Sequence, residues 1–97
     1  MRAGCHPTAV VDPGARLAEG VTVGAYAVIG PEVEIGPRCV LEAFAVVQGR
    51  TLLGPDNHVG AGAVLGGEPQ DVKYAGEPTQ LVLGRGNRIG RHAILHR

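Results

Sequence analysis

The feature that most constrains this chain is an aliphatic residue at every sixth position. The spacing starts at Cys5, continues to Leu65 and resumes in the same phase at Leu83. Neither a helix, with its period of about 3.6 residues, nor a single strand, with its period of about 2, produces this pattern. The residues in phase are Cys5, Val11, Leu17, Val23, Ile29, Ile35, Leu41, Val47, Leu53, Val59, Leu65, Leu83, Ile89 and Leu95. A short strand followed by a tight turn every six residues is typical of a parallel β-helix.

The other positions of the hexapeptide also favour one residue type each. Glycine commonly follows the aliphatic residue, where a positive φ or a close backbone approach would require it. Proline recurs one position later, where its fixed φ suits a turn. Small side chains lie two positions before the aliphatic residue, mostly alanine, with Cys39, Thr51 and Asn57 as near equivalents. These columns predict one flat strand and one turn per hexapeptide.

Three hexapeptides would close one triangular coil, so we expect residue i to stack on residue i+18 in a single all-β domain over residues 1–97. Only three aromatic residues are present, which predicts a narrow, aliphatic core. Neighbouring coils would lie about 4.8 Å apart, so Cys5 and Cys39 would be separated by a rise of about 9 Å and could not form a disulfide. We therefore expect two free thiols that pack as small hydrophobic groups.

The repeat fails at residues 66–82, where the two positions in phase are Asp71 and Glu77. Because neither side chain suits an aliphatic core, we expect this segment to leave the prism as a loop. Two Glu-Pro pairs would stiffen it. A solenoid that extrudes one polar loop has often placed a functional site there, although a tolerated insertion with solvated charges is the alternative. The side chains carried outward would be Gln70, Asp71, Lys73, Tyr74, Glu77 and Thr79.

Charge and hydropathy exclude several other functions. The formal net charge is zero with histidine neutral, which argues against nucleic-acid binding. No stretch approaches the roughly 18 apolar residues of a membrane span, and the N-terminus lacks the pattern of a signal peptide. We therefore expect a cytoplasmic protein that neither spans a membrane nor binds nucleic acid.

Several segments together carry a resemblance to a known family. The run from Gln70 to Thr79, reading QDVKYAGEPT, is the most specific, and GNRI at 86–89, ILHR at 94–97 and HPTA at 6–9 agree with it. The chain resembles the acyl-carrier-protein:UDP-N-acetylglucosamine O-acyltransferases over nearly its whole length. This resemblance implies a left-handed coil, although most β-crossovers are right-handed. It also implies a cytoplasmic homotrimer with active sites between neighbouring prisms. The reaction it implies is transfer of a 3-hydroxyacyl group from acyl carrier protein to the glucosamine 3-hydroxyl of UDP-N-acetylglucosamine, in lipid A biosynthesis.

The resemblance also implies a set of substrate-binding residues. By matched position Gln70 would bind substrate, Asp71 would contact a sugar or acyl hydroxyl, Lys73 would help to hold the substrate, and His96 would line the cleft. No metal or cofactor is implied. The general-base histidine of the family would lie beyond Arg97, as would the remaining coils and the helical C-terminal region. We therefore expect a chain truncated at its C-terminus, without a catalytic residue of its own and inactive alone.

Other interpretations of the polar residues remain open. Arg85, Arg88 and Arg91 predict either a solvated edge or a docking patch for acyl carrier protein. His6 and His96 share a repeat position but lie at opposite ends of the chain, and His58 and His92 occupy two other positions, so no zinc ligand set is recognised. Two further functions compete with the transferase. One is a non-catalytic β-helix scaffold that self-associates through its coil edges, and the other is a different hexapeptide acyltransferase or acetyltransferase.

Overall fold

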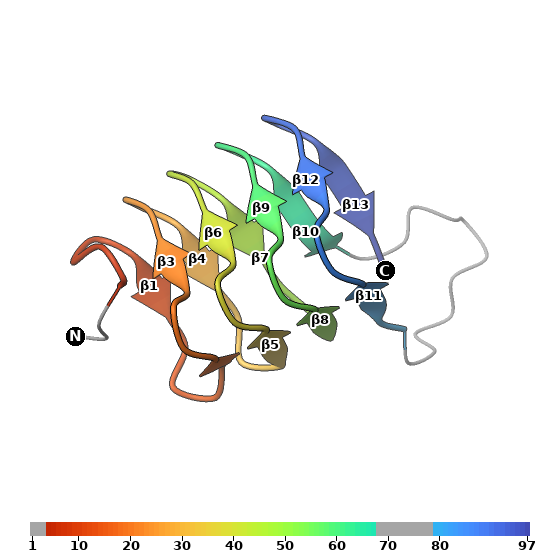
Figure 1. The fold of residues 1–97 in the computed structure, drawn as a ribbon, viewed down its shortest axis with the longest axis horizontal. Helices are drawn as coiled ribbons and strands as arrows, with labels where there is room; N and C mark the ends of the chain where they lie inside the picture. The colour runs from red at the N-terminus through yellow and green to blue at the C-terminus, as the bar shows by residue number, and fades with distance from the viewer. Residues whose placement is uncertain (1–3, 68–78) are drawn as a thin grey trace.

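The computed structural model describes residues 4–67 and 79–97, which form a left-handed parallel β-helix of stacked triangular coils (Figure 1). The described residues contain short strands, one isolated bridge between Cys5 and Val23, turns and irregular connections, and no helix. No helix in them is long and apolar enough to cross a membrane. The strands are β1 (Val10–Val11), β2 (Arg16–Leu17), β3 (Thr22–Val23), β4 (Val28–Ile29), β5 (Val33–Ile35), β6 (Val40–Leu41), β7 (Val46–Val47), β8 (Thr51–Leu53), β9 (His58–Val59), β10 (Val64–Gly67), β11 (Leu81–Leu83), β12 (Arg88–Ile89) and β13 (Ile94–His96).

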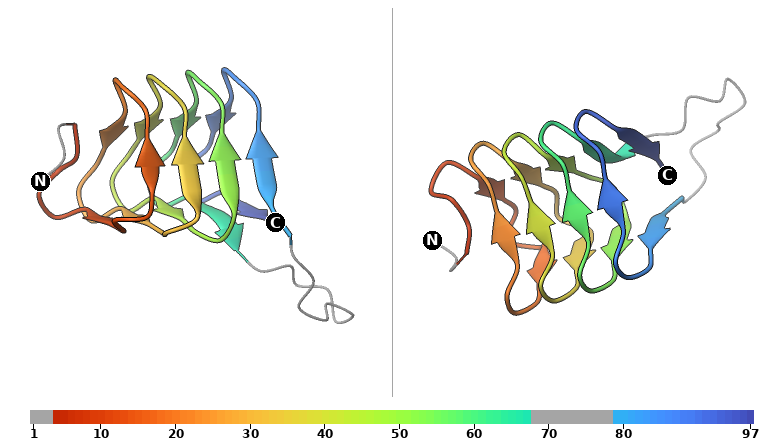
Figure 2. Two further views of the ribbon diagram at one scale, coloured as in Figure 1. Left: turned by 90° about the horizontal axis from the view of Figure 1, so that it is seen from below. Right: turned by 45° about the horizontal axis from the view of Figure 1, so that its top comes forward.

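Every third strand joins the same sheet, so the prism has three faces (Figure 2). Face 1 holds β1, β4, β7, β10 and β13; face 2 holds β2, β5, β8 and β11; face 3 holds β3, β6, β9 and β12. All pairs are parallel, and up to Leu65 the partners lie 18 residues apart, as in the pairs Val11 with Ile29 and Ile29 with Val47. The predicted coil of three hexapeptides is therefore confirmed.

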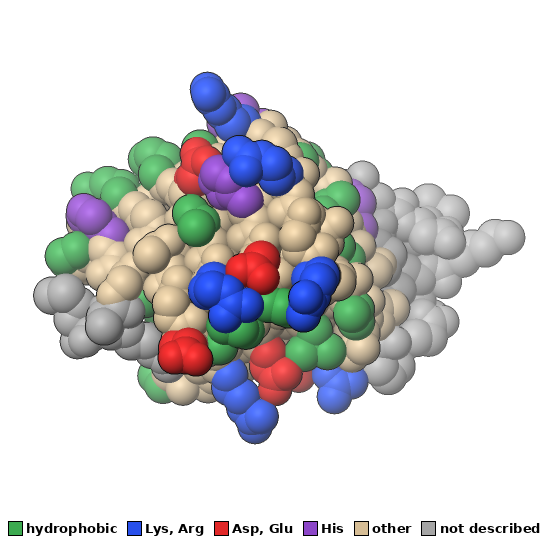
Figure 3. Space-filling model, viewed as in Figure 1, with side chains coloured by type: hydrophobic (Ala, Val, Ile, Leu, Met, Phe, Trp, Pro, Cys, Tyr) green, Lys and Arg blue, Asp and Glu red, His purple; other side chains and the backbone are tan. Residues whose placement is uncertain are grey.

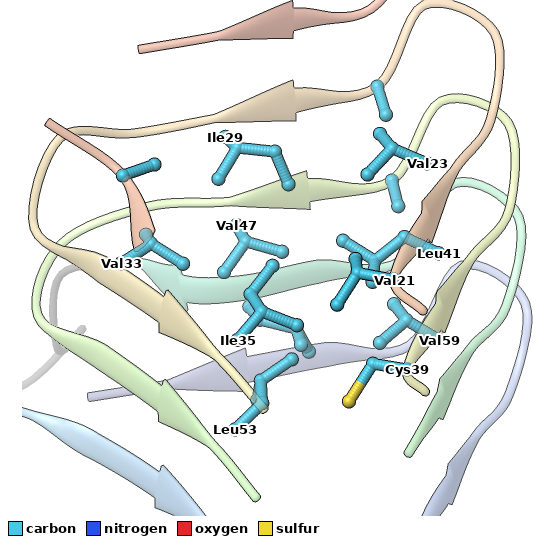
Figure 4. Close-up of a cluster of buried hydrophobic side chains, with 14 of the residues drawn as sticks. Val21, Val23, Ile29, Val33, Ile35, Cys39, Leu41, Val47, Leu53 and Val59 are labelled. Atoms are coloured by element: carbon cyan, nitrogen blue, oxygen red, sulfur yellow. The ribbon is translucent and has the colours of Figure 1, made fainter. Parts of the chain in front are cut away.

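The core consists of the residues in phase and the small residues two positions before them (Figure 4). Ile29, Leu41 and Leu65 are at most 1% exposed. Burying an aliphatic side chain of this size is worth about 1.5–3 kcal/mol, so repetition of the pattern stabilises the coils collectively. The core is aliphatic, as predicted, because Tyr26 and Phe44 lie outside it with more than half of their area exposed. Both cysteines are free thiols, also as predicted.

The corners of the prism differ from the turn geometry that the glycine column suggested. Several glycines directly after the aliphatic residue lie close to the backbone of the next coil, where a side chain would not fit. A Cβ on Gly24, for example, would lie only 2.6 Å from the Ala43 nitrogen. Apart from Gly66, positive φ occurs mostly two positions later instead, even at residues other than glycine: Tyr26, Arg38, Phe44, Asp56 and His92. At these positions the residue's N–H bonds to the neighbouring coil, as when Phe44 N donates to Ala25 O at 2.9 Å. Bonds between coils therefore hold a backbone conformation that L-residues ordinarily avoid.

The interruption adds residues without disturbing the register of the coils. β11 pairs with β8 so that Leu83 lies beside Leu53, a separation of 30 residues instead of 18. The insertion is thus two hexapeptides long, which is why the aliphatic phase resumes unchanged. Asn57 joins the coils on either side of it: Nδ2 donates to Gly54 O at 2.8 Å and Gly84 O at 2.7 Å, while Oδ1 accepts from Asn87 N at 2.7 Å.

The structure narrows the predicted loop at both ends. Gly66 and Gly67 belong to β10, and Leu81 and Val82 belong to β11, so these four residues are strand and not loop. The aliphatic phase could not locate these limits, because the strands are fixed by pairing with β13 and β8. Thr79 and Gln80 precede β11 without regular structure, and the hydroxyl of Thr79 is buried instead of pointing outward. The rest of the predicted loop, residues 68–78, lies outside the described residues.

Candidate functional site

The candidate site lies at the corner between faces 1 and 2, where β10 ends and β11 begins. The pairing of β10 with β13 shifts register between Leu65 and Gly67, which is a bulge. Gly66 adopts φ +82°, and a Cβ there would lie 2.0 Å from Gln48 O and 2.3 Å from Thr51 Oγ1. Only glycine fits both the conformation and the space. This bulge ends the regular ladder of face 1 at the start of the predicted loop.

Two polar side chains flank Gly67 at this corner. Gly67 pairs with His96 across the bulge, and its position lies close to Gln48 from the preceding coil. A Cβ on Gly67 would be 3.4 Å from Gln48 Nε2 and 3.7 Å from His96 Nδ1, so both side chains border the same open space. An amide and an imidazole can each donate or accept a hydrogen bond, which suits a ligand rich in hydroxyl groups.

Arg97 brings a positive charge to the same corner. Its backbone nitrogen donates to Gly67 O at 3.0 Å, which fixes the residue beside the bulge. Its side chain lies across Gly49, where a Cβ would be 2.7 Å from both Cδ and Nε. The Nε is buried and has no hydrogen-bond partner among the described residues. A guanidinium in this position can recognise a phosphate or carboxylate group.

A hollow of about 360 Å³ extends from this corner along face 2. Its lining includes Glu32, Arg50, Thr51 and Gln80. Gln80 comes directly before β11, so the chain re-enters the prism at this hollow. Arg50 and Glu32 are 3.8 Å apart and both exposed, a loose ion pair that water or a ligand can compete with. Thr51 lines this hollow and also lies against the position of Gly66, so the hollow borders the corner.

The residues predicted from sequence are only partly placed. His96 lies at the end of β13, exposed, at the corner just described. Gln70, Asp71 and Lys73 lie outside the described residues, so their roles remain predictions. Sequence reasoning missed Gln48 and Arg97. The only signal for Gln48 is that it replaces the glycine common at its repeat position, and Arg97 carried no signal beyond its place after His96.

The other histidines are not part of this corner. His58, on the outside of β9, is bonded through Nε2 to the carboxylate of Glu42. His92 occupies a corner between faces 3 and 1, and His6 bonds locally to Thr8. Within residues 4–67 and 79–97 no three His, Cys, Asp or Glu side chains gather in a way that could hold a metal ion.

Comparison with known proteins agrees with the hexapeptide architecture described above. The family model described as bacterial transferase hexapeptide (six repeats) matches residues 32–67. Two relatives carry the name acyl-[acyl-carrier-protein]--UDP-N-acetylglucosamine O-acyltransferase. The one from Saccharophagus degradans is 46% identical to this chain and the one from Xanthomonas campestris pv. campestris is 49% identical, each over 92 residues and 95% of this chain. The resemblance predicted from the sequence is therefore confirmed.

Solved structures agree. The chain is similar to a crystal structure of a UDP-N-acetylglucosamine acyltransferase, with a TM-score of 0.93 and 34% identity over 95% of this chain and 36% of that one. It is also similar to LpxA from Acinetobacter baumannii, with a TM-score of 0.94 and 42% identity over 97% of this chain and 36% of that one. The chain spans about 36% of the length of the curated relatives it matches.

Proposed function

We propose that this chain forms the repeat-bearing part of an acyltransferase that moves a 3-hydroxyacyl group from acyl carrier protein to the 3-hydroxyl of UDP-N-acetylglucosamine, in lipid A biosynthesis. The observation that carries the proposal is the 46–49% identity to O-acyltransferases of that name over 95% of the chain. The proposal includes a cytoplasmic location for the reaction.

The corner site supplies groups that suit a sugar nucleotide. Gln48 and His96 border the same space and would bond to sugar hydroxyls. Arg97 would attract the diphosphate, because a guanidinium forms charge-assisted bonds to phosphate oxygens. Asp71 and Lys73, which resemblance assigns to substrate, belong to the segment that begins immediately after this corner. The proposal assigns no general base within residues 1–97, because the resemblance implies a later histidine and the chain spans about 36% of the length of its relatives.

The proposal includes a homotrimer, and face 1 offers the surface for it. Each of its strands has an aliphatic residue at the same outward position, and these five residues lie in one ladder: Val10, Val28, Val46, Val64 and Ile94. Val10 is 61% exposed and Ile94 is 60% exposed. Tyr26 and Phe44 extend this patch at the adjacent corner, where their rings stack with centroids 5.5 Å apart. An apolar face of this continuity is typical of a surface covered by another chain.

Sedimentation velocity of matched variants tests the trimer. Val28→Glu places a charge in the middle of the face 1 patch, whereas Val82→Glu places one at an exposed outward position of face 2. We expect Val28→Glu to sediment as a monomer and Val82→Glu as a trimer. Equal behaviour of the two variants would refute face 1 as the contact, and polydisperse filaments of the unmodified protein would favour the scaffold function.

A transfer assay tests the activity. The complete protein is incubated with a 3-hydroxyacyl carrier protein and UDP-N-acetylglucosamine, and mass spectrometry follows addition of the acyl group to the sugar nucleotide. We expect transfer to this acceptor and none to its 3-deoxy analogue. His96→Ala and Gln48→Ala should each raise the KM for UDP-N-acetylglucosamine by about tenfold, the value of one lost hydrogen bond. Transfer only from acetyl-coenzyme A, or onto an amino group, would instead assign the protein to another hexapeptide acyltransferase class.

A further inference from the structure

The charges of this neutral chain are segregated along its length. Of the described residues, those from 4 to 67 contain three basic and six acidic residues, a formal charge of −3. Residues 78–97 contain four arginines and no acidic residue, a formal charge of +4. Because the coils stack in sequence order, the segregation in sequence becomes a segregation along the axis of the prism. The last coil is therefore a positively charged end on an otherwise acidic solenoid.

The arginines of the earlier coils have acidic partners, and most of those in the last coil do not. Arg16 lies 3.1 Å from Glu34 and Arg38 lies 2.8 Å from Asp56. Arg88 and Arg91 are exposed and have no acidic group within ion-pair distance among the described residues. Their charge is thus available to a partner instead of being neutralised within the coil.

Three of these arginines lie across one face. Arg85 lies at the corner after β11, Arg88 on the outside of β12, and Arg91 at the corner after β12, so the row crosses face 3 from edge to edge. Arg85 is close enough to Asp56 to contribute to the lowered pKa of that carboxyl, but Arg38 already holds both oxygens of Asp56. Figure 3 shows basic side chains over β9 and β12 on this side of the molecule.

A hollow of about 300 Å³ lies between β9 and β12 beneath this row. Arg88 and Arg91 line it together with Glu42 and His58. The carboxylate of Glu42 is bonded to His58 through one oxygen, and no ion pair joins it to Arg88 or Arg91. The hollow therefore presents two cations at its rim, in a position that a protruding acidic side chain can enter.

We propose that Arg85, Arg88 and Arg91 form the docking surface for the acidic acyl carrier protein; this inference rests on the proposed function. A partner that contacts all three must lie across the whole face, which suits a protein helix with acidic side chains better than a single phosphate group. Face 3 is also separate from the corner of Gln48, His96 and Arg97, so both substrates can bind together. A carrier protein delivers its acyl group on a long flexible arm, so its docking surface need not touch the reacting atoms.

Matched substitutions in the complete protein test this surface. Arg88→Gln and Arg91→Gln each remove one charge from the row, and Arg16→Gln removes one charge from the equivalent outward strand position on face 2. Surface plasmon resonance measures binding to a 3-hydroxyacyl carrier protein at several salt concentrations. We expect each single change in the row to weaken binding about threefold and the double variant about tenfold, with a shallower salt dependence, because exposed charges act mainly on association. Arg16→Gln should bind as the unmodified protein does.

Two further measurements separate this inference from the proposed function. UDP-N-acetylglucosamine affinity, measured by calorimetry, should be unchanged in Arg88→Gln, Arg91→Gln and the double variant, and the KM for carrier protein should rise with the dissociation constant. An equal loss in Arg16→Gln, or a loss of nucleotide affinity in place of carrier affinity, would overturn the docking surface. Transferase activity with an unchanged KM for carrier protein in the double variant would overturn it while leaving the proposed function intact. An unmodified protein that binds neither substrate would overturn both.

Discussion

Asn57 should be the most sensitive polar residue of the described coils, because it joins the coil before the insertion to the coil after it. The side chain is 1% exposed and makes three hydrogen bonds, at 2.8, 2.7 and 2.7 Å. Asn57→Ala removes all three and leaves Gly54 O, Gly84 O and Asn87 N without these partners. At about 1 kcal/mol for each bond, with a further cost where a buried group stays unpaired, we expect a loss of about 2–4 kcal/mol in the free energy of unfolding.

The matched control is Asn87→Ala. Asn87 occupies the same repeat position one coil later, is exposed, and contributes only backbone atoms to the coil interface, its nitrogen to Asn57 and its oxygen to His58. Its substitution should change the free energy of unfolding by less than about 0.5 kcal/mol. Urea denaturation followed by circular dichroism measures both variants against the unmodified chain.

Hydrogen exchange locates the effect. In a solenoid each coil is stabilised mainly by its neighbours, so loss of the Asn57 bridge should loosen one coil interface first. The amides of Gly54, His58 and Gly60 donate to the coil after the insertion, and they should exchange faster in Asn57→Ala. The amides of Val28 and Gly30, which donate between earlier coils, should change much less. A loss below about 1 kcal/mol, or uniform acceleration of exchange in all coils, would refute the role of Asn57 as the bridge.

Three other predictions follow from single features. Burial raises the pKa of the Cys39 thiol, so a maleimide at pH 8 should modify the half-buried Cys5 and leave Cys39 unmodified until the chain unfolds; equal rates would contradict this. A hydrogen bond and the charge of Arg38 lower the pKa of Asp56, so the pair stabilises the fold above the ordinary carboxyl pKa of about 4 and loses this effect as the pH falls through the lowered value. Asp56→Asn should therefore be less stable than the parent at pH 7 and approach it in acid, and a constant difference in thermal midpoint would count against the pair. Gly49 has φ +63° and an Ala there would crowd Gly66 O, so Gly49→Ala should cost about 1–2 kcal/mol in urea denaturation, whereas no change would show that the corner can relax.

The candidate site was only partly predictable from sequence. The resemblance placed His96 in the site, and the structure has it at the corner beside the predicted loop. Gln48 precedes it by 48 residues, and nothing in the local pattern brings the two together. They meet because β7, β10 and β13 are neighbours on face 1 and because the bulge at Gly66 opens the corner. Contacts of this kind depend on which strand the chain pairs with after the insertion, and the repeat pattern does not predict that pairing.

The hexapeptide period by itself determined the coil, its three faces and its core. A period of six has one satisfactory solution for burying an aliphatic residue from each repeat, so the spacing alone predicts that Ile29 pairs with Val47. Only the tertiary structure decided the corners and the bridge across the insertion. Phe44 keeps a positive φ because its N–H bonds to the neighbouring coil, and Asn57, which in sequence is merely one more small side chain, bonds to residues 27 and 30 positions later. Burial follows from local spacing, whereas these hydrogen bonds follow from distances between coils that exist only after the chain has closed.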